Sequence, residues 1–191
     1  MAAIKTHCLC WSSCKGLDHY PALIPSAPDA SWYPDKFMAP KEKNEEALDD
    51  ALKVIWMMHN QLLSLGFKNE QILLIGFSQG ACLLSQYVLT KPVKFKAVAL
   101  LTGGYLGPEG VDWKFRGDLG QTPIYITTAK NDDWVPPARV EETAAVLKLM
   151  NAKVKVDIFE ERPHEISPIE IPLSAQFIIL SFFTYSFYKC G

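Results

Sequence analysis

The stretch ILLIGFSQGACLL, residues 72–84, is an apolar run, a sharp interruption and a second apolar run. Its first four residues fit a buried strand, and the residues after the second glycine fit a helix. Between them Gly76 and Gly80 flank Ser78, giving the pattern G-x-S-x-G. In a nucleophile elbow this turn is so tight that both flanking positions favour glycine, and the serine hydroxyl stands exposed. The stretch predicts Ser78 as a nucleophile, with the backbone N–H of Gln79 as an oxyanion donor. A glycine-rich turn without chemistry is the alternative.

Strands and helices alternate along the chain on both sides of this turn. We expect a helix to begin after Asn44, which suits an N-cap, and to end before Gly66. Strands are predicted at 22–24, 72–75, 97–101, 124–127 and 154–159, and further helices at 81–89 and 138–150. The alternation predicts an α/β fold with a mostly parallel sheet and helices on both faces. The loops at the carboxyl ends of its strands are expected to carry the chemistry.

A serine nucleophile needs a base, and the base needs a carboxylate to orient it. Asp132 and Asp133 follow the strand predicted at 124–127, and His164 follows the strand predicted at 154–159. Both loops lie in the order Ser, Asp, His that suits the elbow. His59 lies on the apolar stripe of the helix after Asn44, where we expect a core histidine with a backbone partner rather than a catalytic one.

Five segments resemble the phospholipase/carboxylesterase family of α/β-hydrolases, whose relatives include the acyl-protein thioesterases. The segments are SAPDASWYPDKFMAPKEKNEE, ILLIGFSQGACLL, LTGGYLGP, NDDWVPPARVEETAAVL and ERPHEI, in the order of the family. The resemblance implies the α/β-hydrolase fold, with Ser78 as nucleophile and His164 as base. In that family the acid lies four residues before the proline of a D-x-x-[VI]-P pattern, which implies Asp132 with Pro136.

The chain departs from the family at both ends. Residues 1–20 contain no H-G-x-G-like loop, which in relatives supplies the second oxyanion donor, so the first strand and this loop are predicted to be missing or divergent. Residues 171–191 are apolar and aromatic, where the family has a charged amphipathic helix. A buried terminal helix or strand is the favoured interpretation of this segment, with a membrane anchor over Phe177–Tyr188 as the alternative.

Composition narrows the class of protein. The 191 residues fit a single domain spanning 1–191, and a net charge of -2 without a basic stripe argues against a nucleic-acid partner. Cys8, Cys10 and Cys14 lack a second pair that would complete a zinc site, so no metal is expected. An odd number of cysteines, five, favours reduced thiols in a cytoplasmic protein.

The predicted function is hydrolysis of carboxylic esters or thioesters through an acyl-enzyme, with no metal or organic cofactor. The substrate is expected to be a small molecule or an acylated partner. Trp32, Tyr33 and Phe37 are candidates for the pocket wall, with packing onto the sheet edge as the alternative. Because the H-G-x-G-like loop is absent, a catalytically weak or inactive protein that acts by binding is the alternative. Membrane association is not expected.

Overall fold

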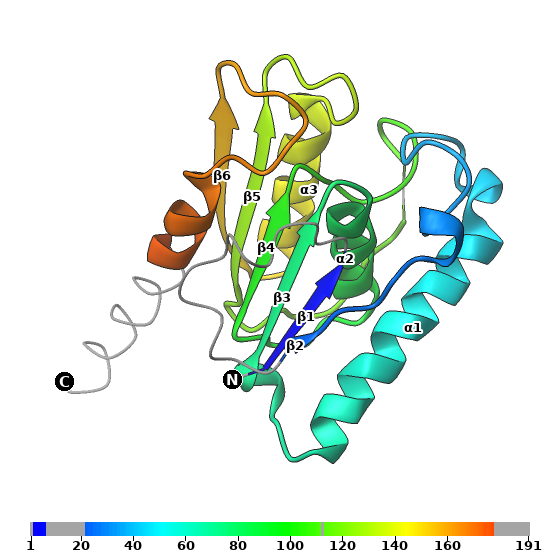
Figure 1. Cartoon of the computed structure of the whole chain (residues 1–191), viewed down its shortest axis with the longest axis vertical. Coiled ribbons are helices and arrows are strands. Elements are labelled where there is room, and N and C mark those ends of the chain that lie inside the picture. Colours follow the sequence, from blue (N-terminus) through cyan, green and yellow to red (C-terminus); the bar gives the residue numbers. More distant parts are fainter. Residues whose placement is uncertain (1, 7–21, 112, 178–191) are drawn as a thin grey trace.

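The computed structural model describes residues 2–6, 22–111 and 113–177, and a parallel sheet of six strands forms its centre (Figure 1). The strands lie in the order β2-β1-β3-β4-β5-β6, and each neighbouring pair is parallel. Their bounds are Ala2–Thr6 (β1), Ala22–Leu23 (β2), Ile72–Phe77 (β3), Ala97–Leu101 (β4), Pro123–Ala129 (β5) and Lys153–Phe159 (β6). The helices are Glu45–Ser64 (α1), Gln79–Thr90 (α2) and Pro137–Leu149 (α3), and residues 170–177 are also helical.

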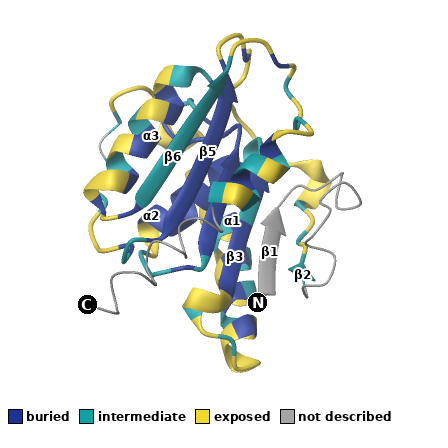
Figure 2. Ribbon diagram, turned by 90° about the vertical axis from the view of Figure 1, so that its left-hand side faces the viewer, coloured by how far each residue is buried: buried dark blue, intermediate teal, exposed yellow. Residues whose placement is uncertain are grey.

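Apolar side chains project from both faces of the sheet, because alternate residues of a strand point to opposite sides. In β4, Val98 and Leu100 join the core beneath α1, α2 and α3, whereas Ala99 and Leu101 face the other way. On that second face the helical residues 170–177 supply apolar partners. The burial colours of Figure 2 show the consequence: β5 is buried along its whole length and β3 along most of it, in the middle of the fold. The predicted α/β architecture with helices on both faces is confirmed.

The first strand is present, so of the two predicted alternatives, a missing or a divergent strand, the first is wrong. β1 lies between β2 and β3, and its register places Thr6 beside Gly76. The carboxyl end of β1 therefore lies next to the turn that carries Ser78. Residues 7–20, where we predicted the divergent loop, lie outside the described residues.

His59 is a core histidine, as its place on the apolar stripe predicts. Its Nδ1 lies 2.7 Å from the hydroxyl of Tyr87 on α2, and its Nε2 lies 2.7 Å from Oδ1 of Asn69. Burial lowers its pKa. The ring thus joins α1 to α2 and to the turn before β3. Both of its partners are side chains, so the backbone partner that we expected is wrong.

Within the described residues, no helix combines the length and the apolar character needed to cross a membrane. The apolar C-terminal segment is described as far as Phe177, and up to that residue it is helical and packs on the second face of the sheet. The remainder of the predicted segment 171–191 lies outside the described residues.

Candidate active site

Ser78 sits at the sharp turn between β3 and α2. Its backbone has φ 52° and ψ −123°, a conformation that L-residues rarely adopt and that a nucleophile elbow requires. Its N–H donates to the carbonyl of Leu101 at the end of β4 (2.9 Å), and its carbonyl accepts from Cys82 N–H (3.0 Å). Gln79 is the first residue of α2, so its N–H has no intrahelical acceptor and points out of the positive end of the helix.

Gly76 is needed for space rather than for an unusual backbone angle. A Cβ at this position would lie 2.6 Å from the carbonyl oxygen of Gly80, a distance too short for a carbon and an oxygen that are not bonded. We expect Gly76→Ala to lower the free energy of unfolding by about 2–3 kcal/mol and to reduce ester turnover, because the collision displaces the elbow.

Gly66→Ala is the matched control for this change. Gly66 has φ +89°, and a Cβ there would meet nothing within 4 Å. Backbone strain alone should cost about 1–2 kcal/mol, with turnover unchanged. Urea unfolding and steady-state kinetics on both variants measure the difference. A Gly76→Ala protein with normal turnover would contradict the close approach.

A continuous series of hydrogen bonds joins the three predicted site residues. Ser78 Oγ lies 2.7 Å from Nε2 of His164, in the loop after β6. On the other side of the ring, Nδ1 lies 2.9 Å and 3.1 Å from the two carboxylate oxygens of Asp132, in the loop after β5. The ring also lies between two aromatic side chains, with centroids 5.3 Å from Phe77 and 6.1 Å from Trp134. Residues 86 positions apart are therefore brought together by loops at the carboxyl ends of strands in one parallel sheet.

The carboxylate of Asp132 is held ionised. Its side chain is fully buried, which opposes ionisation, but hydrogen bonds from His164 and from the N–H groups of Val135 (2.8 Å) and Trp134 (3.0 Å) outweigh this effect. Its pKa is therefore below the ordinary value. Asp133, the neighbour that the residues alone left as an alternative, is exposed to solvent.

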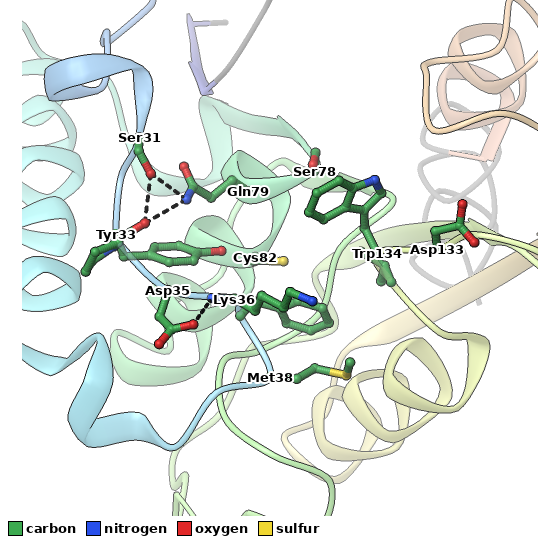
Figure 3. A pocket seen from close by; sticks show the side chains of 13 residues that line it. Ser31, Tyr33, Asp35, Lys36, Met38, Ser78, Gln79, Cys82, Asp133 and Trp134 are labelled. Atoms are coloured by element: carbon green, nitrogen blue, oxygen red, sulfur yellow. Dashed lines mark hydrogen bonds between the residues drawn. The ribbon is translucent and has the colours of Figure 1, made fainter.

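A pocket of about 360 Å³ opens beside Ser78 (Figure 3). Residues 31 and 33–38 form one wall and residues 133–135 form the other, with Ser78, Gln79 and Cys82 between them. Burial raises the pKa of the Cys82 thiol to about 11, so this sulfur stays protonated near neutral pH and does not compete as a nucleophile.

The side-chain amides of Gln79 and Asn44 form hydrogen bonds with the segment 31–38. The Gln79 side chain accepts from the N–H of Trp32 (2.8 Å) and donates to Ser31 Oγ and the Tyr33 carbonyl (3.0 and 3.1 Å). Asn44 was expected to cap α1, but its side chain makes no capping bond. Its amide instead accepts from the N–H of Asp35 and donates to the carbonyl of Lys36.

The aromatic residues of the pocket differ from the prediction at one position. Tyr33 and Phe37 line it, but Trp32 does not: its side chain is 4% exposed and lines a neighbouring cavity of about 380 Å³ against α1. Trp134, which sequence reasoning missed, lines the pocket and is 60% exposed. Its position two residues after Asp132, in the same loop, could have indicated that it lies at the site.

Similarity to known proteins points to one family. The sequence profile of the phospholipase/carboxylesterase family matches residues 10–181. None of the curated proteins matches the chain significantly. Among solved structures, a phospholipase/carboxylesterase from Dyadobacter fermentans is 34% identical with a TM-score of 0.87, over 93% of this chain and 88% of that one.

More distant structures share the fold. SOBER1 of Arabidopsis thaliana is 20% identical with a TM-score of 0.77, covering 95% of this chain and 99% of its own. The carboxylesterase of Bacillus cereus is 16% identical with a TM-score of 0.73, covering 95% of this chain and 88% of its own. With the family profile matched over most of its length, the chain belongs to the phospholipase/carboxylesterase family and is a hydrolase with the α/β-hydrolase fold.

Proposed function

We propose that the chain cleaves carboxylic esters or thioesters through a covalent acyl-enzyme on Ser78. The hydrogen-bonded series from Ser78 Oγ through His164 to Asp132 carries the proposal. In the acylation step Oγ attacks the carbonyl carbon while His164 Nε2 takes the hydroxyl proton. Asp132 keeps the other ring nitrogen protonated and stabilises the imidazolium that forms.

The tetrahedral intermediate carries its negative charge on the former carbonyl oxygen. The N–H of Gln79 is the donor that we assign to this oxyanion, at the positive end of α2. When the intermediate collapses, His164 returns the proton to the departing oxygen or sulfur, and the acyl group stays on Ser78. Water, deprotonated by the same histidine, then releases the acid and restores the hydroxyl.

The pocket supports an acyl group of modest size. Tyr33, Phe37 and Trp134 offer apolar surface beside Ser78, and the volume of about 360 Å³ lies at the lower end of ligand sites. We propose a small-molecule or acylated substrate, without a nucleic-acid partner, in the cytoplasm, where the buried free thiol of Cys82 stays reduced. No metal or organic cofactor enters any step.

Two measurements on the purified protein test this proposal. A fluorophosphonate should label Ser78, identified by peptide mass spectrometry, and labelling should fail in Ser78→Ala. A series of chromogenic esters and thioesters with increasing acyl length should then rank turnover against pocket size. A protein that reacts with neither the phosphonate nor any ester would overturn the proposal in favour of a binding role.

The second oxyanion donor bears on the rate. Because residues 7–20 lack the H-G-x-G-like loop, we expect the native chain to label with the phosphonate but to turn over esters slowly. Since β1 already pairs with β3, replacing residues 7–20 with an H-G-x-G-containing loop should suffice to raise kcat by about a hundred-fold. Steady-state kinetics of both proteins decide the matter. Equal kcat values would mean that residues 7–20 already supply a donor.

A further inference from the structure

A buried arginine lies two positions before His164. Arg162 is 6% exposed, and its guanidinium pairs with the carboxylate of Glu170, whose side chain is fully buried (Nη1 to Oε2, 3.6 Å). Burying both charges carries a large desolvation cost, which only good geometry and further hydrogen bonds offset. The contacts of this pair therefore indicate what it holds in place.

The guanidinium binds the backbone on both sides of His164. Its Nη1 donates to the carbonyl oxygen of Pro163 (3.4 Å) and to that of Glu165. These are the residues immediately before and after the histidine. One nitrogen of the guanidinium thus contacts both neighbours of the residue whose ring must face Ser78.

The other arm of the guanidinium reaches the strand end that also holds Ser78. Nη2 donates to Oγ1 of Thr102 at 2.6 Å. Thr102 has φ 56° and directly follows Leu101, whose carbonyl accepts the N–H of Ser78. Its own N–H donates to the carbonyl of Thr127 on β5 (2.9 Å). The loop that carries His164 and the turn that carries Ser78 are therefore both hydrogen-bonded to the carboxyl end of β4.

Glu170 closes the loop from its far side. One carboxylate oxygen accepts from Oγ1 of Thr127, and the other accepts from the N–H of Ser167 at 2.6 Å. Residues 162 and 170 thus clamp the two ends of the segment that carries His164, and both ends are attached to neighbouring strands, β4 and β5.

We propose that Arg162, neutralised by Glu170, is a positioning residue that sets the geometry of His164 relative to Ser78. The inference rests on the proposed function, because it assigns the clamp to that same relay. A purely structural pair would affect the stability of the fold but not the rate of a folded enzyme. A positioning pair affects kcat, because a displacement of about 1 Å in a catalytic group can cost about a hundred-fold in rate.

The test compares variants that separate charge from geometry. In R162M/E170Q both charges are removed, so no unpaired carboxylate is buried. In R162K a cation remains for Glu170, but one ammonium group cannot span Thr102 and both carbonyls. We expect kcat to fall by about a hundred-fold in both, with KM within about threefold and phosphonate labelling slowed in parallel.

Arg139→Met is the matched control. Arg139 is 2% exposed, pairs with Glu142 and donates to the carbonyls of Tyr105 and Gly107, which lie outside the relay. It should lose thermal stability like R162M/E170Q while keeping its kcat. A folded R162M/E170Q protein with kcat within threefold of the native value would overturn the inference and leave the proposed function intact.

Hydrogen–deuterium exchange of peptides covering residues 160–168 gives a readout independent of turnover. Exchange should accelerate in R162M/E170Q and remain native in Ser78→Ala, which abolishes the chemistry alone. If the native protein neither labels nor turns over, the proposed function fails, and exchange still decides whether the clamp orders this loop. Unchanged exchange in R162M/E170Q would overturn the clamp.

Discussion

Replacing Ser78 with alanine should lower kcat for an activated ester by about 10⁵-fold, to a level set by binding and by the oxyanion donor alone. The expectation follows from the 2.7 Å contact between Ser78 Oγ and His164, since a base without its nucleophile can only activate water. The measurement is steady-state hydrolysis with active-site titration of the native protein.

The double variant Ser78→Ala/His164→Ala sharpens this test. Groups that act as one unit do not lose rate additively, so the double variant should be about as slow as Ser78→Ala. Circular dichroism and thermal unfolding serve as controls, because Ser78 is only partly buried and its replacement should leave the fold intact. Losses that multiply across the two positions would contradict a shared relay.

The acid gives the second large effect. Asp132→Asn should lower kcat by about 10⁴-fold, because an amide that donates to Nδ1 places the imidazole proton on the wrong nitrogen. Both oxygens of Asp132 face that nitrogen at 2.9 and 3.1 Å. Steady-state hydrolysis of the same ester by the variant and the native protein gives the ratio.

Asp133→Asn is the matched control one residue away. Its carboxylate is exposed and its charge is screened by solvent, so kcat should stay within a factor of about two. Both variants should unfold in a single transition close to that of the native protein. A large loss of kcat in Asp133→Asn together with a small loss in Asp132→Asn would mean that the acid is misassigned.

The sequence predicted the elements that carry the site because their signals are local. The glycines around Ser78 specify a tight turn, and hydrophobic periodicity separates the strands from the helices on either side. The residues alone left Asp132 and Asp133 as alternatives. The resemblance to the family, whose pattern ends at Pro136, implied Asp132, and the structure places Asp132 against His164. Boundaries differed by a few residues, as for β5, which extends to Ala129.

What the sequence did not reveal depends on long-range contacts. β1 is only five residues long, and its place in the sheet depends on pairing with β3, some seventy positions away. Asn44 can cap a helix or bind a distant backbone, and only the path of residues 35–36 decides between them. Arg162 reads as a solvated charge within EERPHEIS until Thr102 and Glu170 are brought beside it.

Gln79 serves the site with two different parts of the same residue. In the proposed mechanism its main-chain N–H faces the developing charge, while its side-chain amide binds the backbone of Trp32 and Tyr33 and the hydroxyl of Ser31. Substitutions in residues 31–33 therefore change the surroundings of the proposed oxyanion donor as well as the shape of the pocket. In the opposite wall, Trp134 is coupled to the acid through its backbone N–H, which donates to Asp132, while its side chain is largely exposed. Divergence of substrate preference at constant turnover is accordingly easier at position 134 than at positions 31–33.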